Sequence, residues 1–245
     1  MAEIKDQPRQ YFIEAAGREL PRTSTIKDLL AKFALVPWAA SCAAQKLKDS
    51  FIDPVMSGEL FDFENVDTKQ LIKDAKSEHR KQSKDALLIG GDVHSAAEHY
   101  FLDGVAPKFK RGSPQSKCWQ GFKLFLREHT IKPEFIEERV WSEAGGGYTT
   151  QPDIVGLIDD IYTVCDIKTS GAFYIPDHPL QLASQRKALT DTMFDGDEMV
   201  IERMAILRLD KSRVKYEFKE FDNYYLWLAA WIKLTELYYA LQAVK

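Results

Sequence analysis

Two aspartates and a lysine near the middle of the chain have the residue types and spacing of a hydrolytic metal site. Asp166 and Lys168 end an otherwise apolar run, Ile161–Lys168, and Asp153 lies upstream of it. Alternate residues of a β-strand share a face, so we expect Asp166 and Lys168 on one face and Ile167 in the core. Carboxylates on neighbouring strands form an oxygen-rich site suited to Mg²⁺ or Mn²⁺. A lysine beside them stabilises negative charge, as phosphodiester hydrolysis requires.

The same residues also have a purely structural interpretation. Asp-x-Lys is a common tripeptide, Asp153 is typical of a turn, and Asp166 and Lys168 would then face solvent. However, an apolar strand makes a buried aspartate and lysine costly unless they have partners or a metal. The apolar surroundings therefore favour the metal site.

A β-hairpin is the element that would bring Asp153 alongside Asp166. We expect strands over residues 148–157 and 161–168, with the turn at Asp159-Asp160. The other elements expected in this half are a strand over 135–142, a glycine turn at 145–147, a helix over 179–190, a hairpin of 199–209 with 214–221, and a helix over 223–243.

The first half of the chain is expected to be helical. The predicted helices cover 26–35, ended by Pro37, then 38–48, a polar helix from 67 or 68, 93–102 after a break or bend at Ile89-Gly90-Gly91-Asp92, and 116–129. The order of elements predicts an α/β (α+β) fold with a central mixed β-sheet flanked by helices. We expect a single domain, 1–245, made of a helical part (1–130), a sheet core (131–222) and a C-terminal helix (223–245).

The composition is that of a soluble globular protein. The chain has 245 residues, of which 45% are apolar and 29% charged. No stretch approaches the ~18 apolar residues that span a membrane, and the N-terminus lacks an apolar signal core. We therefore expect a cytoplasmic protein with no membrane partner. The cysteines Cys42, Cys118 and Cys165 lie far apart, which favours buried thiols over a disulfide framework or a zinc site.

Positive charge is concentrated in two segments although the formal net charge is −4. Residues 69–84 carry six Lys or Arg against Asp74 and Glu78, and residues 105–127 carry six with no acidic residue. The net charge argues against a non-specific nucleic-acid binder. A local basic face can nevertheless bind phosphates, although a solvated helix face gives the same pattern.

Several motifs in one order resemble the PD-(D/E)xK nuclease superfamily, in its RecB-like and bacteriophage-exonuclease branch. The resemblance spans about residues 20–190 and rests on Leu20-Pro-Arg-Thr-Ser-Thr-Ile-Lys27, Trp38-Ala39, Gly90-Gly-Asp-Val-His94, Glu137 with Val140, Pro152-Asp153, Asp166-Ile-Lys-Thr-Ser170 and Gln181-Leu-Ala-Ser-Gln185. It implies a restriction-endonuclease-like core. Gln185 stands where the family usually has a tyrosine.

The resemblance also implies a role for each site residue. Asp153 and Asp166 would bind the metal, with the carbonyl of Ile167 as a further ligand and His94 completing the metal sphere. Lys168 would be the catalytic lysine. Glu137 would be the upstream acidic residue, with Glu138 as the alternative because strand register decides which face each occupies. Gln181 would contact DNA or support the carboxylates.

The function implied is a DNA exonuclease of phage-type recombination or processing, dependent on one or two Mg²⁺ or Mn²⁺ ions. Its partner would be DNA, as a single strand or a duplex end, with a single-strand annealing or binding protein as a further partner. A structure-selective endonuclease and a non-catalytic nucleic-acid-binding protein are the alternatives. Iron–sulfur members of the family carry four cysteines near the domain ends, so three elsewhere predict no cluster.

Overall fold

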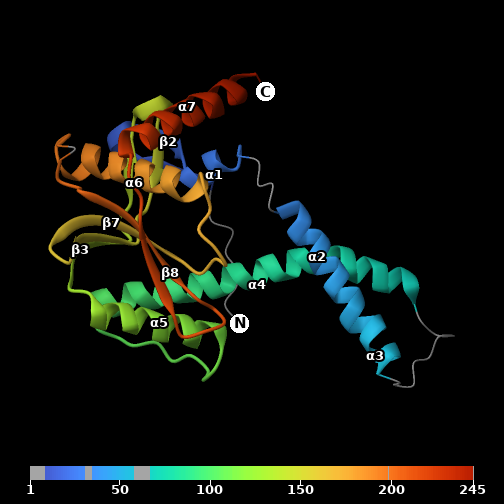
Figure 1. The fold of residues 1–245 in the computed structure, drawn as a ribbon. Helices are drawn as coiled ribbons and strands as arrows, with labels where there is room; N and C mark the ends of the chain where they lie inside the picture. Colours follow the sequence, from blue (N-terminus) through green and yellow to red (C-terminus); the bar gives the residue numbers. More distant parts are fainter. Residues whose placement is uncertain (1–8, 31–34, 58–66, 198, 245) are drawn as a thin grey trace. The chain divides into compact units, whose positions relative to one another are not determined.

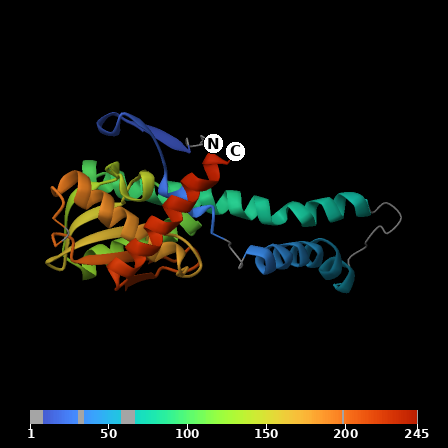
Figure 2. The same cartoon turned by 90° about the horizontal axis from the view of Figure 1, so that it is seen from above.

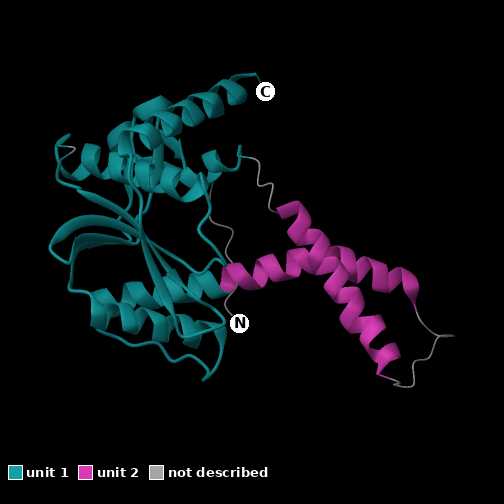
Figure 3. Cartoon of the chain, viewed as in Figure 1, with its two compact units in different colours: residues 1–30, 89–245 teal, residues 31–88 magenta. Residues whose placement is uncertain are grey.

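The computed structural model describes residues 9–30, 35–57, 67–197 and 199–244. The chain divides into two compact units, one of residues 1–30 and 89–245 and one of residues 31–88 (Figure 3). The division falls inside the long helix α4 (Thr68–Asp103), so each unit contains one part of it. All the predicted site residues belong to the first unit.

A five-stranded mixed β-sheet forms the centre of the first unit. Its strand order is β3-β6-β7-β8-β9; β7 and β8 are parallel, and the other neighbours are antiparallel. The chain passes from β7 to β8 through helix α6, the kind of crossover that a parallel pair requires. The strands are β3 (Ile131–Ile136), β6 (Ile154–Ile158), β7 (Ile161–Lys168), β8 (Arg203–Leu209) and β9 (Tyr216–Glu220).

Helices cover both faces of this sheet. Helices α6 (Asp177–Met193) and α7 (Tyr224–Ala243) lie on one face, and α5 (Pro114–Glu128) with the C-terminal part of α4 lies on the other (Figure 1). Seen from above, α6 and α7 lie over the strands (Figure 2). Each face has its own hydrophobic core, because alternate side chains of β7 point to opposite faces: Val164 packs with α6 and α7, and Ile167 packs with α5.

Smaller elements complete the two units. In the first unit they are β1 (Gln10–Ile13), η1 (Glu14–Ala16), β2 (Arg18–Pro21), α1 (Thr23–Lys27), β4 (Val140–Ser142), η3 (Ala144–Gly146) and β5 (Tyr148–Thr150). The second unit contains α2 (Leu35–Leu47), η2 (Lys48–Ile52), α3 (Asp53–Met56) and the N-terminal part of α4. Strands β1 and β2 pair, as do β4 and β5.

The N-terminal segment differs from the sequence prediction. The segment expected to be helical begins with the β1–β2 hairpin. Helix α1 (Thr23–Lys27) is shorter than the helix predicted over 26–35. Residues 31–34 of that predicted helix lie outside the described part. Helix α2 begins at Leu35 and holds Pro37 in its first turn, where it was expected to end a helix. Proline is tolerated there because the first N–H groups of a helix have no intrahelical partner.

Helix α4 also differs, because it continues through Gly90 and Gly91 as one helix, where a break or bend between two helices is predicted. Each glycine costs roughly 1 kcal/mol of helix propensity. Just beyond them Val93, Ala96 and Ala97 are buried in the core shared with α5. Burial of this face stabilises the helix more than two glycines weaken it, since packing supplies most helical stability in proteins.

Two predicted strands are each divided in two. The strand expected over 135–142 is interrupted at Glu137, whose φ of 51° removes it from the extended conformation. Its residues form the end of β3 and the whole of β4. The strand expected over 148–157 is interrupted at residues 151–153 and forms β5 and β6. Glu137 and Asp153 thus lie where the chain leaves one sheet for another.

The predicted fold class, a mixed sheet flanked by helices, is confirmed, and so is the β6–β7 hairpin that turns at Asp159-Asp160. Among the described residues, no helix has the length and apolar character needed to cross a membrane.

Candidate metal centre

The carboxyl end of β7 brings the predicted site residues together. The antiparallel register pairs Ile154 with Cys165, which places Asp153, just before β6, next to Asp166 of β7. Asp166 and Lys168 point towards α6, and Ile167 is buried in the opposite core as the alternation predicts. Strand pairing alone therefore fixes two carboxylates and an ammonium group within one small region.

His94, Glu137 and Asp153 form the candidate metal-binding cluster. One potential ligand atom from each lies within 4.8 Å of the other two. The Nδ1 atom of His94 is 2.9 Å from Oδ1 of Asp153 and 3.8 Å from Oε1 of Glu137. Two atoms bound to one divalent cation at about 2.0–2.6 Å lie at most about 4–5 Å apart, so the spacing fits a shared ion. One imidazole nitrogen and two carboxylate oxygens suit Mn²⁺ or Mg²⁺.

Backbone geometry decides which glutamate joins this cluster. Glu137 has a φ of 51°, its amide donates to the carbonyl of Asp153 at 3.3 Å, and its carbonyl accepts from the Gln151 side chain at 2.7 Å. Its carboxylate is thereby directed towards His94, whereas Glu138 is exposed. Of the two glutamates left open by the sequence, the structure brings Glu137 to the site.

Asp153 is the most constrained member of the cluster. Its side chain is buried; Oδ2 accepts a hydrogen bond from the amide of Ile167, and Oδ1 pairs with His94. The carboxylate therefore links α4 to the carboxyl end of β7. The amide of Ile167 holds Asp153 in place, while the proposed metal ligand is the carbonyl of the same residue.

Asp166 has a different environment from Asp153. It is buried, forms an ion pair with Lys168, and its Oδ1 accepts from the side-chain amides of Gln181 at 2.7 Å and Gln185 at 2.8 Å. The sequence assigned the ion to His94, Asp153 and Asp166, but among the described residues the cluster within 4.8 Å has Glu137 in place of Asp166. Asp166 lies next to that cluster as the anchor of Lys168.

Two residues that sequence reasoning missed hold Asp166 in this arrangement. Gln185 lies one helical turn after Gln181 on α6, so the i, i+4 spacing of two glutamines could have identified it. Lys27 of α1 donates to Oε1 of Gln181 at 2.8 Å and to Oδ2 of Asp177 at 2.9 Å. Lys27 therefore fixes which end of the Gln181 amide faces Asp166. Lys27 ends the Leu20–Lys27 motif, but that motif assigns it no role at the site.

Burial and neighbouring charges shift the pKa values of all three cluster residues. Burial raises the pKa of Glu137 to about 7, with the nearby Asp153 charge acting in the same direction. Burial alone would lower the pKa of His94, but the Asp153 carboxylate outweighs it and raises that pKa to about 10. Burial similarly opposes ionisation of Asp153, yet His94 keeps the pKa of Asp153 below its ordinary value. Protons thus hold positions that a divalent cation can take.

Lys168 is a permanent cation at neutral pH. Burial acts to lower the pKa of Lys168, but Asp166 and then Asp153 raise it above its ordinary value. Burial lowers the pKa of Lys27, with Asp177 acting against this effect and Lys168 adding to it. The ammonium group of Lys168 can therefore stabilise negative charge but does not serve as a proton acceptor.

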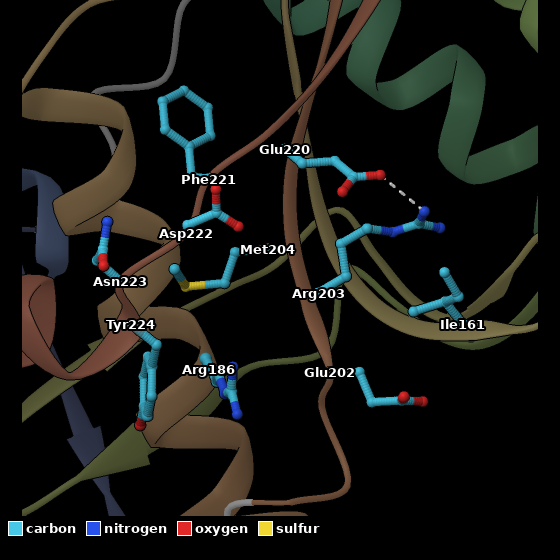
Figure 4. A pocket seen from close by; sticks show the side chains of 10 residues that line it. All are labelled: Ile161, Arg186, Glu202, Arg203, Met204, Glu220, Phe221, Asp222, Asn223 and Tyr224. Carbon is cyan, nitrogen blue, oxygen red and sulfur yellow. Dashed lines mark hydrogen bonds and ion pairs between the residues drawn. The ribbon is translucent and has the colours of Figure 1, made fainter.

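A pocket of about 280 Å³ lies away from these residues, at the other end of β7 (Figure 4). It is lined by residues that include Ile161, the first residue of β7, whereas Lys168 is the last. Its two arginines are already engaged: Arg203 pairs with Glu220 at 2.9 Å, and Arg186 stacks 4.0 Å from the ring centre of Tyr224. The pocket contains none of the predicted site residues.

Comparison with known proteins adds no family. No protein-family model matches the sequence, and no curated protein matches it. A solved structure titled "Crystal structure of SSO0001" matches with 12% sequence identity and a TM-score of 0.29. The match covers 59% of this chain and 82% of the other chain. At that TM-score the similarity carries no argument about the site.

The ionisation of His94 is directly measurable. We expect the His94 imidazole of the metal-free protein to titrate near pH 10 in an NMR titration, and Asp153→Asn to lower that value because it removes the neighbouring charge. Since the unfolded chain titrates near 6.5, the stability that His94 contributes is complete below pH 6.5 and is lost as pH rises towards 10. A His94 that titrates at or below its ordinary pKa contradicts this description.

The amide of Gln181 provides a test of the support around Asp166. Gln181→Met leaves both Lys27 and Asp166 without one hydrogen-bond partner, so we expect the free energy of unfolding to fall by about 1.5–3 kcal/mol in urea denaturation. Gln120→Met is the matched control, because its amide donates to Ser116 one turn earlier in its own helix, and should change stability by less than about 0.5 kcal/mol. Equal effects of the two substitutions would refute the role of Gln181.

Proposed function

We propose that the protein is a metal-dependent DNA nuclease of the PD-(D/E)xK type, acting as an exonuclease. The observation that carries the proposal is the convergence of the His94–Glu137–Asp153 cluster with the Asp166–Lys168 pair at one end of β7. Phosphodiester hydrolysis needs both parts: a site for a hard divalent cation, and a fixed positive charge beside it.

In this proposal His94, Glu137 and Asp153 would hold the cation. When bound, a divalent cation makes water a stronger nucleophile at neutral pH and offsets charge on the phosphate oxygens. Lys168 contributes a protonated ammonium group on the same end of β7, where it stabilises negative charge on the scissile phosphate. Asp166 fixes the position of Lys168 and is itself held by two glutamine amides.

The order of the motifs supports DNA as the substrate and exonuclease as the mode. The same motif set resembles the RecB-like and phage-exonuclease branch, and basic segments at 69–84 and 105–127 offer charge for the phosphate backbone. An endonuclease built on the same site would cut a covalently closed circle, whereas an exonuclease requires an end. Substrate topology therefore separates the two modes.

The test is cleavage of end-labelled linear DNA and of a closed circle with Mg²⁺ or Mn²⁺. We expect loss of linear DNA only, and a decrease of at least about a hundredfold in Asp153→Asn, Asp166→Ala and Lys168→Ala. Glu137→Gln and Glu138→Gln form a matched pair: the first should lose activity and the exposed second should retain it.

The other outcomes are equally informative. A cut circle would establish the endonuclease. DNA binding with no metal-stimulated cleavage would establish a non-catalytic binding protein. Full activity in Asp166→Ala or Lys168→Ala would remove the site assignment, because those residues would then take no part in the reaction.

A further inference from the structure

Five cations lie on one face of the N-terminal part of α4, within the second unit. They are spaced four, three, four and four residues apart: Lys69, Lys73, Lys76, Arg80 and Lys84. At about 100° per residue this spacing places all five within an arc of about 80°. All five residues are exposed. We call this row of residues the basic stripe.

The acidic residues of the same segment lie on the other side of the helix. Asp74, Glu78 and Asp85 fall within an arc of about 40° that faces away from the centre of the basic stripe. Asp74 accepts from Gln70 at 2.6 Å and Glu78 from Gln82 at 3.2 Å. In the described part of the chain, no residue of the basic stripe forms an ion pair, so its charge is not neutralised from within.

Helix α2 packs on a different side of α4. Trp38 meets His79 edge to face at a centroid distance of 6.5 Å, the thiol of Cys42 donates to Gln82, and Ala75 is buried. These contacts hold the second unit together (Figure 3) and leave the basic stripe open to solvent. The stripe is therefore not needed to pack the helices of this unit.

We propose that the basic stripe binds the phosphate backbone of DNA, the class of polymer whose cleavage is proposed above. At a rise of about 1.5 Å per residue the stripe extends about 22 Å, with successive cations about 4.5–6 Å apart. DNA presents a phosphate about every 3.4 Å along each strand, so a segment of this length offers more phosphates than the stripe has cations. The identity of the nucleic acid as DNA rests on the proposed function.

The pattern favours DNA over a lipid surface. A helix that lies in a membrane interface carries a broad face of large apolar residues opposite its charged face. Opposite the basic stripe α4 carries Asp74, Glu78 and Asp85, which an anionic surface would repel. A linear row of cations with carboxylates on the opposite side of the helix matches a linear polyanion.

The test is the salt dependence of DNA binding, measured by fluorescence anisotropy of a labelled oligothymidylate and a labelled duplex in EDTA, which prevents cleavage. The test variant combines Lys69→Gln, Lys73→Gln, Lys76→Gln and Arg80→Gln. We expect the slope of log K against log salt to decrease by about 2.8 for the single strand and about 3.6 for the duplex, the values for four lost phosphate contacts. Circular dichroism checks that the variant is folded.

The matched control carries the same change of charge elsewhere: Lys132→Gln, Arg213→Gln, Lys215→Gln and Lys233→Gln, each of which is exposed and already paired with an acidic residue. The slope of log K against log salt for this control should differ from that of the wild type by less than the value of one phosphate contact, about 0.7 for the single strand and about 0.9 for the duplex. An unchanged slope in the test variant, or an equal decrease in both, overturns the proposal. So does a test variant that loses binding to phosphatidylserine vesicles but retains binding to DNA.

The two proposals fail separately. If the wild type cleaves DNA and the slope of the test variant is unchanged, the proposed nuclease activity stands and the proposed role of the basic stripe is wrong. A decreased slope with no metal-dependent cleavage retains the basic stripe as a DNA-binding surface and removes the nuclease.

Discussion

The buried carboxylate of Asp153 is the constraint on which the rest of the site depends. Its two oxygens are used in different directions, one by the amide of Ile167 in β7 and the other by His94 in α4. A buried carboxylate costs several kcal/mol unless it is paired and hydrogen-bonded, so its partners are fixed with it. The carbonyl of Asp153 also accepts from the amide of Glu137, which brings the third member of the cluster. One residue thus ties a helix, a hairpin and a strand end into one site.

The residues around Asp153 form two pairs with different roles, His94 with Glu137 and Asp166 with Lys168. His94 and Glu137 both hold protons more strongly than usual beside Asp153, which is the state expected of a cation site that is filled by protons instead. Asp166 is paired with Lys168 and hydrogen-bonded by glutamine amides, so its carboxylate is already neutralised within the protein. His94 and Glu137 are suited to exchanging their protons for a metal. Asp166 and Lys168 are suited to presenting a fixed ammonium charge.

The sequence predicts those parts of the site that strand periodicity determines. Asp153, Asp166 and Lys168 were identifiable because a hairpin with a two-residue turn sets both register and face. Glu137 as a cluster member was not separable from Glu138, because the choice depends on a left-handed backbone conformation imposed by Gln151 and Asp153. Lys27 reaches Gln181 across 154 positions of sequence, a contact that no local pattern encodes. The uninterrupted α4 also depends on tertiary packing, because Val93, Ala96 and Ala97 are buried in the core shared with α5.

The most direct measurement is the titration of the metal-free protein with Mn²⁺, followed by electron paramagnetic resonance, with the released protons recorded in weakly buffered solution. The account predicts saturable binding at neutral pH that releases protons, because the ion displaces those on His94 and Glu137, and it predicts loss of binding in Asp153→Asn with retention in Glu138→Gln. Binding that is unaffected by Asp153→Asn, or the absence of saturable binding in the wild type, would contradict it.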